Sequence, residues 1–254
     1  MRVIVLSCVF LFSSIAGANN YIVARLAPTK NVVVRSEVSG IVNSYTYENG
    51  DDVRQGEGLL SLSAKDYSLN VDLSKYEMDV STSELEAQEK QLKRYQSLFN
   101  KKGVSASDLE NQLRVTNISR AQLNVNKTKY KIAQRTLGKS TPDAPFDGVV
   151  IDRGIELGQF VSVGDPLYTI ADMSQLKIRF HLLEMDFNKF KKGDTLKVTI
   201  PSTGKSYTGI VSVLSPAIRE SEPGFVVEVT LDNHDAELNP GLASHVYFGE
   251  RDAE

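Results

Sequence analysis

The stretch GIVNSYTYENGDDVRQGEGLLSL, residues 40–62, decides the fold because the chain contains its pattern twice. Residues 148–170, GVVIDRGIELGQFVSVGDPLYTI, follow the same layout without a gap. In both copies short apolar segments are separated by glycines, which is typical of short strands and tight turns. Each copy therefore predicts half of a small β-structure. The residues that recur 108 positions later are Gly40, Val42, Glu48, Gly50, Val53, Gly56 and Leu59.

Four of the recurring glycines mark turns. Gly50 and Gly56 of the first copy correspond to Gly158 and Gly164 of the second, with different side chains around them. Glycine tolerates backbone angles that other residues avoid. The recurrence therefore indicates the backbone geometry of paired turns rather than a ligand site.

The segment between the copies has helical periodicity. No proline occurs from Leu62 to Ser140, and apart from Gly138 at the end of the segment Gly103 is the one glycine. Gly103 is expected to end a first helix, while Ser105 and Asp108 resemble a capping box that begins a second. Two helices of about 33 residues would form an antiparallel hairpin about 50 Å long. Heptad-like spacing predicts an apolar seam of Leu69, Leu73, Tyr76, Val80, Leu85, Leu92, Tyr95, Phe99, Leu109, Leu113, Leu123, Tyr130 and Leu137.

Polar residues such as Ser83, Thr116 and Arg120 interrupt this seam. A two-helix hairpin alone then buries little apolar area, and neighbours packing beside it would explain its length. The alternative is a hairpin that only stabilises its own domain. In either case antiparallel helices bring their ends together, so the two copies are expected to form one β-sandwich into which the hairpin is inserted.

The last third of the chain alternates apolar and polar residues again. Turn signals lie at residues 192–194, 201–204, 223–224 and 240–241, and residues 184–190 predict one short helix. Several short strands favour a small closed barrel, since closure removes exposed edges. The expected strands are residues 176–182, 195–200, 207–214, 225–231 and 243–248.

Composition places the 254-residue chain among ordinary globular proteins, with 41% hydrophobic residues and a net charge of -3. It offers no basic surface for nucleic acid. An apolar run at residues 3–15 precedes Ala-Gly-Ala at residues 16–18, so we expect a signal peptide cleaved before Asn19 rather than a retained anchor. The only cysteine, Cys8, then belongs to the signal, and the mature chain has neither a disulfide nor a thiol nucleophile.

No motif indicates catalysis or metal binding. His181, His234 and His245 are isolated, without a second histidine or a carboxylate at metal-ligand spacing. The sequence also lacks a phosphate-binding loop, a nucleophile elbow and a recognisable Ser, His and Asp constellation. We therefore expect no enzyme activity, no cofactor and no metal.

The order of these parts resembles the periplasmic adaptor subunits of tripartite efflux pumps of the resistance-nodulation-division type, also called membrane fusion proteins. The segments VSGIV…GDDVRQGEGL and APFDGVV…GQFVSVGDPL are similar to the split biotinyl/lipoyl-like domain of that family, and LKIRFHLLEMDFNKFKKGDTLKV and NPGLASHV resemble its barrel. At the hairpin turn, RYQSLFNKKGVS places Arg94, Leu98 and Ser105 at the spacings of the family's tip.

The resemblance implies a mainly β fold with a long α-helical hairpin: a split biotinyl/lipoyl-like β-sandwich interrupted by an antiparallel coiled-coil hairpin, followed by a small β-barrel. Family members often add a membrane-proximal domain, for which residues 21–38 and the six residues after Phe248 offer little sequence, so we expect it to be absent or vestigial. The domains expected are a signal peptide at 1–18, N-terminal strands with the first half-sandwich at 19–63, the hairpin at 64–138, the second half at 139–171 and the barrel at 172–254.

The implied function is a non-enzymatic periplasmic adaptor, held at the inner membrane by a transporter of the resistance-nodulation-division type and linked to an outer-membrane channel. Protomers, commonly six, would form a ring around a conduit for small molecules. Arg94, Leu98 and Ser105 would contact the channel. In the simpler interpretation Arg94 is a solvated side chain, Leu98 packs in the hairpin seam and Ser105 caps a helix.

Other classes remain open. A biotinylated or lipoylated carrier domain has a lysine at the turn between the half-motifs, but the hairpin occupies that turn and no Met-Lys-Met or Asp-Lys-Ala tripeptide is present. An exported hydrolase would need a polar constellation that the sequence lacks. An adaptor for another class of transporter is also compatible with the short ends of the chain.

Overall fold

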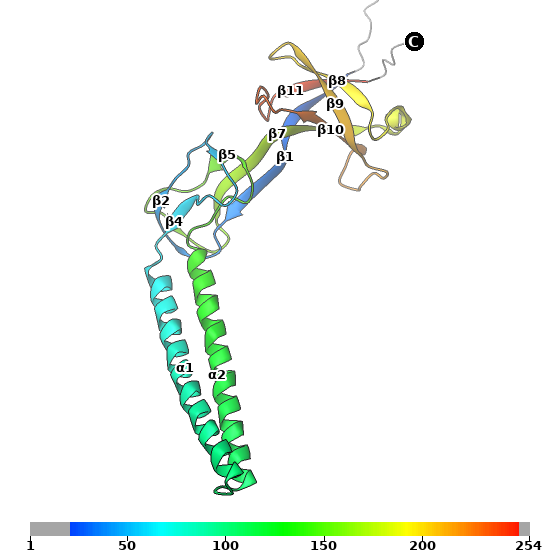
Figure 1. Ribbon diagram of the computed structural model, residues 1–254. Helices are drawn as coiled ribbons and strands as arrows, with labels where there is room; N and C mark the ends of the chain where they lie inside the picture. The colour runs from blue at the N-terminus through cyan, green and yellow to red at the C-terminus, as the bar shows by residue number, and fades with distance from the viewer. Residues whose placement is uncertain (1–20, 249–254) are drawn as a thin grey trace, which may run out of the picture. The chain divides into compact units, whose positions relative to one another are not determined.

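The computed structural model describes residues 21–248, so the predicted signal peptide and its cleavage before Asn19 lie outside the described residues. The chain divides into two compact units. One unit runs from Lys30 to Asp172, and the other joins Tyr21 to Thr29 with Met173 to Phe248. Figure 1 follows the elements from blue to red along the chain.

The β-sandwich of the first unit is built from both copies of the repeated pattern. Strands pair across the copies, β2 with β6 and β3 with β5, in both cases antiparallel. Each copy thus completes the other's sheet, which confirms that the two form one sandwich. The strands are β2 (Gly40–Tyr45), β3 (Asp52–Val53), β4 (Leu60–Leu62), β5 (Gly148–Arg153), β6 (Phe160–Val161) and the beginning of β7 (Pro166–Leu182).

The sandwich core takes equivalent side chains from each copy. Val42 and Leu59 of the first copy and their counterparts Val150 and Leu167 are almost completely buried. Neither copy has enough apolar surface to form a core alone, so burial in one depends on the other. The remaining buried members are Val38, Val53, Leu60, Leu62, Ala144, Ile155, Val161, Tyr168 and Ile170.

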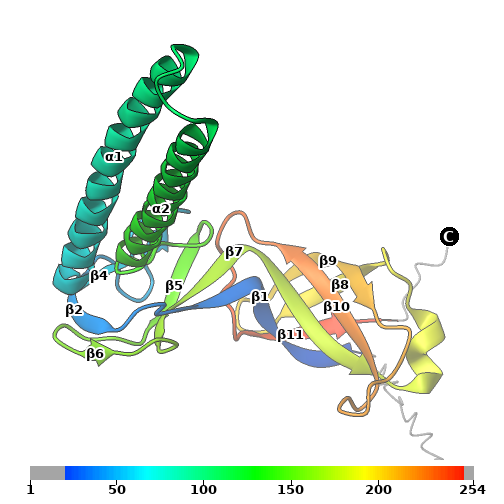
Figure 2. The same ribbon diagram turned by 90° about the horizontal axis from the view of Figure 1, so that it is seen from below.

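Two long helices, α1 (Lys65–Asn100) and α2 (Ala106–Gly138), run side by side and antiparallel (Figures 1 and 2). Their ends meet at the sandwich, where the Leu62 N–H donates to the Ser140 carbonyl at 2.8 Å. The predicted capping box at the start of α2 is confirmed. The Asp108 N–H donates to the Ser105 hydroxyl at 3.2 Å, and the Ser105 N–H donates to the Asp108 carboxylate at 3.1 Å.

The predicted apolar seam is wrong over the first half of α1 and also at Phe99 and Leu113, which are exposed. Leu69, Leu73, Tyr76 and Val80 are all more than half exposed. Small and polar residues fill the helix contact instead, because short side chains let the helices approach and then hydrogen-bond across the seam. The buried residues of the two helices are Ser74, Ser81, Leu85, Thr116, Leu123, Asn126 and Ala133.

Polar contacts join the middle parts of the two helices. The Asn126 amide donates to the Ser81 hydroxyl at 2.5 Å and to the Glu77 carbonyl at 3.2 Å. Nearer the tip, the Gln112 amide donates to Gln88 at 2.8 Å. Two ion pairs, Lys129 with Glu77 at 3.2 Å and Arg120 with Glu89 at 2.8 Å, lie along the same contact.

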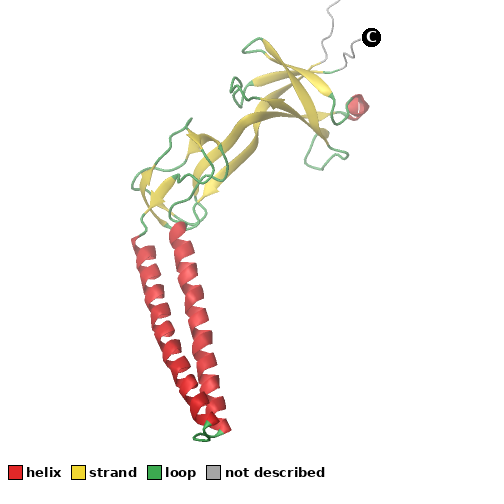
Figure 3. Cartoon of the chain, viewed as in Figure 1, coloured by secondary structure: helices red, strands yellow, loops and turns green. Residues whose placement is uncertain are grey.

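The second unit is a barrel of six strands in the order β1-β11-β8-β9-β10-β7, closed by pairing of β7 with β1. The five strands expected from the sequence are confirmed, and the expected short helix is a 3-10 helix, η1 (Glu184–Lys189). Figure 3 shows that helix is otherwise confined to the hairpin. The strands are β1 (Tyr21–Arg35), β7, β8 (Thr195–Ile200), β9 (Lys205–Leu214), β10 (Phe225–Asp232) and β11 (Ala243–Tyr247).

One domain boundary differs from the prediction. Residues 19–63 were expected to belong together, but Tyr21 to Arg25 pair with β11 and belong to the barrel. The reason is that β1 is a single 15-residue strand whose first part completes the closed barrel. Its alternation gives no signal of the change of unit, because both parts are extended chain.

Candidate functional site

The turns of the two copies are closed by equivalent hydrogen bonds. The Glu48 N–H donates to the Asp51 carboxylate at 2.8 Å, and 108 residues later the Glu156 N–H donates to the Gln159 side chain at 2.9 Å. A second turn repeats in the same way, from Arg54 to Glu57 at 2.9 Å and from Ser162 to Asp165 at 2.8 Å. The two copies therefore share the hydrogen bonds that close their turns as well as their sequence pattern.

The glycines of these turns bond across the copies. The Gly50 N–H donates to the Val150 carbonyl at 2.8 Å, and the Gly158 N–H donates to the Val42 carbonyl at 2.9 Å. Val42 and Val150 are themselves equivalent positions, so the bonds obey an internal two-fold relation. The second pair follows the same rule, from Gly56 to Ala144 at 2.9 Å and from Gly164 to Ser36 at 2.8 Å.

All four turn glycines have positive φ angles: 97° at Gly50, 82° at Gly56, 78° at Gly158 and 95° at Gly164. A Cβ placed at any of them would meet no atom within 4 Å. Backbone conformation, and not lack of space, is therefore what favours glycine at these positions.

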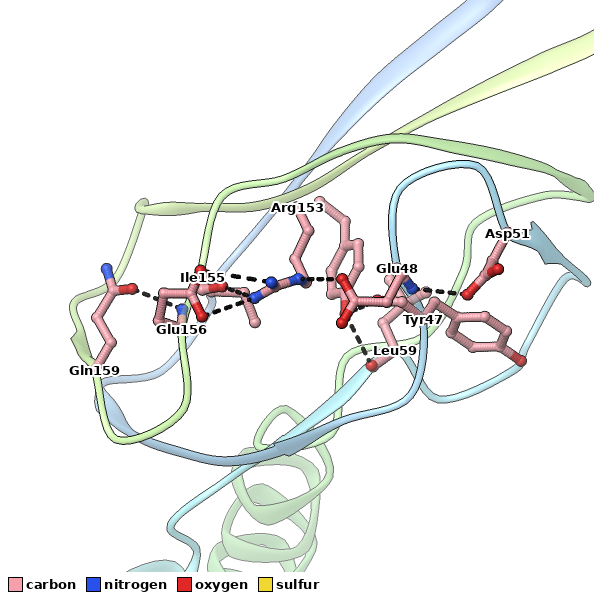
Figure 4. Close-up of polar contacts among 9 residues, drawn as sticks. Tyr47, Glu48, Asp51, Leu59, Arg153, Ile155, Glu156 and Gln159 are labelled. Carbon is pink, nitrogen blue, oxygen red and sulfur yellow. Dashed lines mark hydrogen bonds and ion pairs between the residues drawn. The ribbon is translucent and has the colours of Figure 1, made fainter.

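Arg153 connects the two copies near the surface (Figure 4). Its guanidinium donates to Glu48 of the first copy at 3.1 Å and lies 4.1 Å from the ring centroid of Tyr45. It also donates to the Ile155 carbonyl and forms an ion pair with Glu156 at 3.3 Å. Sequence reasoning missed this contact because Arg153 has no counterpart in the first copy, where position 45 is a tyrosine.

Tyr168 connects the copies inside the core. Its hydroxyl donates to the Tyr47 carbonyl at 3.0 Å, and the Leu59 carbonyl lies 3.4 Å away. The side chain is 1% exposed. Burial raises the pKa of Tyr168 to about 12, because the buried phenolate would lose its hydration.

At the hairpin tip, α1 ends in a Schellman motif. The Gly103 N–H donates to the Leu98 carbonyl and the Lys102 N–H donates to the Phe99 carbonyl, both at 2.9 Å. The left-handed residue is Lys102, with φ 59°, and α1 ends at Asn100, three residues before the glycine expected to end it. Leu98 is 45% exposed and Phe99 39%, and Phe99 therefore does not complete the seam as expected.

The three tip residues singled out by the sequence differ in their surroundings. Arg94 and Leu98 are exposed and one helical turn apart, which places them on one face of α1. Arg94 donates to the Gln91 side chain. The Ser105 hydroxyl donates to the Asp108 carboxylate at 2.6 Å, and this bond lowers the pKa of Asp108. Ser105 is thus occupied in the helix cap, whereas Arg94 and Leu98 face outward.

Two histidines of the barrel make ordinary structural contacts. His181 bonds to Glu222, which also pairs with Arg179 at 2.7 Å, and the bond from His181 lowers the pKa of Glu222 ahead of the effect of Arg179. His245 stacks on Tyr21 with 4.4 Å between ring centroids. Within residues 21–248 no three His, Cys, Asp or Glu side chains come together as a metal site.

Among the described residues, no helix has the length and apolar character needed to cross a bilayer. The position at which a carrier domain would present a lysine between its half-motifs is occupied by the two helix ends. There Lys139 is held by Glu37 at 2.7 Å, and this ion pair lowers the pKa of Glu37.

A sandwich formed by two copies of one β-unit around an inserted helical hairpin, with a six-stranded barrel, defines the class of membrane fusion proteins, the adaptors of efflux pumps. The chain belongs to the CzcB-like, barrel-sandwich hybrid domain family, whose sequence model matches residues 30–172. This match confirms the family inferred from the two half-motifs.

Two bacterial relatives match most of this chain at low sequence identity. The nodulation protein NolF of Rhizobium meliloti is 24% identical over 222 residues, 87% of this chain and 60% of NolF. The cobalt-zinc-cadmium resistance protein CzcB of Cupriavidus metallidurans is 24% identical over 222 residues, 84% of this chain and 41% of CzcB. The chain therefore spans less than two thirds of either relative.

The fold is shared with a solved structure. The crystal structure of MacA from Actinobacillus actinomycetemcomitans superposes with a TM-score of 0.77 at 20% sequence identity. The superposition covers 91% of this chain and 78% of that one. At this level of identity the likeness establishes the fold.

Proposed function

We propose that the chain is a non-catalytic periplasmic adaptor that links an inner-membrane transporter of the resistance-nodulation-division type to an outer-membrane channel. It acts as a ring of six protomers around a conduit for small molecules. The observation that carries the proposal is the hairpin: helices of 36 and 33 residues leave the sandwich together and end in an exposed apolar tip. At 1.5 Å per residue they extend about 50 Å, far more than the sandwich core needs.

The hairpin is proposed to be one segment of a coiled-coil tube. Its own seam buries mainly small and polar side chains, so the two helices gain little from burying apolar surface against each other. Helices of this length with a polar seam are stabilised by neighbours that cover their outer faces. A ring of protomers supplies those neighbours.

Docking to the channel is proposed to depend on Leu98 and Arg94. Leu98 provides an apolar side chain at the end of α1, and Arg94 provides guanidinium donors on the same face. Ser105 contributes by holding the start of α2 through its bonds to Asp108. The capped end fixes the shape of the surface that Leu98 presents.

The test is Leu98→Asp, because a charge placed at the centre of a small apolar contact loses water without gaining a partner. Leu113→Asp is the matched control, since Leu113 on α2 is 44% exposed but lies about two helical turns past the start of that helix. Leu98→Asn is a second variant, which avoids placing a negative charge at a helix C-terminus.

We expect both Leu98 variants to remain folded by circular dichroism while crosslinking to the channel and export in cells are lost. Leu113→Asp should retain both. Continued export by folded Leu98→Asp would contradict the docking role, and so would equal loss in the Leu113 control. Intact mass of the purified chain should equal that of the unmodified polypeptide, whereas an added biotinyl or lipoyl group would identify a carrier domain.

A further inference from the structure

A small cavity lies at the base of the hairpin, where the end of α2 reaches the sandwich (Figure 1). Its volume is about 250 Å³, and its walls come from two segments that are distant in the sequence, residues 34–37 and 135–143. The site therefore exists only in the folded unit. Drug-sized ligands occupy pockets of about 300 to 1,000 Å³, so this cavity suits a smaller group.

Cations outnumber carboxylates among the charged residues that line the cavity. The cations are Arg35, Arg135 and Lys139, and the carboxylates are Glu37 and Asp143. Among these residues the only ion pair within residues 21–248 joins Lys139 to Glu37 at 2.7 Å. In the same part of the chain the side chains of Arg135 and Asp143 make no hydrogen bond. The cavity thus contains a guanidinium whose donors are unused.

The three cations converge on this cavity from different directions. Arg35, at the end of β1, donates from one nitrogen to the Gly164 carbonyl at 2.8 Å, which positions the guanidinium and leaves its other donors available. Arg135 lies one helical turn before Lys139, so both project from one face of α2. The hydrogen bond and charge of Lys139, and then the charge of Arg135, lower the pKa of Glu37. Both helix cations therefore act on the same point.

The pairing of Glu37 with Lys139 is open to competition. The Glu37 side chain is 66% exposed and that of Lys139 is 31% exposed. Exposed ion pairs contribute little to stability, because water and salt screen them. When Glu37 turns toward solvent, the lining holds three cations and one carboxylate, a net charge of +2. The C-terminus of α2 offers only about half a negative charge, which does not cancel it.

We infer that this cavity binds the phosphate group of a small phosphate monoester. Such a group carries about two negative charges at pH 7, which equals the charge of the lining once Glu37 is displaced. Each guanidinium can donate two parallel hydrogen bonds to phosphate oxygens, while Lys139 adds a compact charge. A carboxylate, with a single charge, would leave the lining positive. The inference goes beyond the proposed adaptor function and does not depend on it.

Two sources present this group. Soluble glycerol 3-phosphate carries it on a small polar substituent, and phosphatidic acid carries it at the surface of a bilayer. Since the chemistry of the phosphate is the same in both, the lining alone recognises either one. The experiment therefore uses both as probes.

Binding of glycerol 3-phosphate to the purified chain is measured from the line width of its phosphorus NMR resonance, at constant ionic strength so that screening is equal in all samples. Arg135→Ala removes the unpaired cation, and Glu37→Gln removes the competing carboxylate. Lys131→Ala is the matched control, because Lys131 is exposed on α2 one turn before Arg135 and does not line the cavity. Circular dichroism establishes that each variant is folded.

We expect saturable binding that is about tenfold weaker in Arg135→Ala, because a charge-assisted hydrogen bond is lost. Glu37→Gln should bind about threefold more tightly, since an exposed pair is worth little. Lys131→Ala should match the wild type. Equal weakening in Arg135→Ala and Lys131→Ala would show general attraction to a basic surface and overturn the site. Unchanged affinity in Glu37→Gln would refute the displacement of Glu37 and the site with it.

Sedimentation with phosphatidylcholine vesicles that contain phosphatidic acid tests the lipid source, with phosphatidylcholine alone as the control. Binding to the phosphatidic acid vesicles that Arg135→Ala abolishes, without binding of glycerol 3-phosphate, would assign the site to a lipid headgroup. Binding of glycerol 3-phosphate alone would assign it to a soluble ligand. A wild-type chain that binds neither probe would overturn the inference and leave Lys139 and Glu37 as an ion pair of the hairpin base.

Discussion

Replacement of Tyr168 by phenylalanine tests how the two copies are held together. The change keeps the buried ring and removes the hydroxyl that donates to the Tyr47 carbonyl at 3.0 Å. The Leu59 carbonyl keeps its bond from the Thr46 N–H at 3.0 Å. Only the Tyr47 carbonyl therefore loses its hydrogen-bond donor at 3.0 Å. One hydrogen bond with a buried acceptor corresponds to a loss of about 1 to 1.5 kcal/mol in the free energy of unfolding at neutral pH.

The same variant also changes how the free energy of unfolding depends on pH. The pKa of Tyr168 is raised from 10.0 to about 12, so folding favours the protonated phenol. A group with a raised pKa contributes stability that is full below its unfolded pKa and is lost as pH rises through the folded pKa. Between pH 8 and pH 11 the wild type should lose at most about 1.4 kcal/mol from this group, and the phenylalanine variant should lose none of it.

Urea unfolding followed by circular dichroism at 222 nm measures these changes, because the two long helices belong to the same unit as Tyr168. Tyr130→Phe on α2 is the control for loss of a phenol that is only partly buried. We expect the wild type to exceed Tyr168→Phe by about 1 kcal/mol at pH 8 and the difference to approach zero at pH 11. A difference that stays constant with pH would refute the role of burial, and no difference at pH 8 would refute the role of the hydrogen bond.

Three further changes have outcomes fixed by local geometry. Gly148→Ala places a Cβ 2.5 Å from the Ala171 carbonyl oxygen and should cost about 2 kcal/mol, whereas Gly40→Ala at the equivalent position has 3.3 Å of space and should cost less; equal melting temperatures would contradict this. Lys102→Gly relieves a φ of 59° and should stabilise the hairpin by about 1 kcal/mol, seen as a higher urea midpoint. Asn126→Leu should stabilise the helix contact by up to about 1 kcal/mol, because the Ser81 hydroxyl that Asn126 contacts still donates to the Glu77 carbonyl within α1. A lower melting temperature of this variant would show that the Asn126 amide is required.

The sequence was sufficient for the order of elements because each signal is local. Repeated glycine turns, the capping box at Ser105 and the alternation of the barrel strands depend on residues close to one another in the chain. The pairing of the copies followed from one further step, since a half-sandwich needs a partner to bury its core. The change of unit within β1 had no local signal and was missed.

The helix contact could not be predicted from apolar spacing. Leu69, Leu73, Tyr76 and Val80 have the regular spacing of a seam, and the pattern itself is real. A single chain provides two faces on which such a pattern can lie, one toward its own hairpin partner and one outward. Hydrogen bonds such as that from Asn126 to Ser81 decide between them, and polar pairs 45 residues apart leave no periodic signal.

At the hairpin tip, too, one feature could be predicted from the sequence and another could not. The spacing of Arg94 and Leu98 placed both on one face of α1, and the structure has both exposed. That Lys102 rather than Gly103 takes the left-handed conformation depends on which carbonyls the turn can reach, which is a matter of loop closure rather than of residue preference.

The bond between Leu62 and Ser140 has a consequence for the order in which the chain folds. Leu62 and Ser140 are separated by 77 residues, and closing so long a loop delays any pairing between the two copies. Once the helices have paired, the ends are already together, which lowers the entropy cost of closure by about 2 kcal/mol. We therefore expect the helix amides to be protected before those of β2 and β5 in pulse-labelled hydrogen exchange during refolding, with simultaneous protection as the contrary result. The hairpin would then have two roles: during folding it brings the two copies together, and in the folded protein it extends from the sandwich.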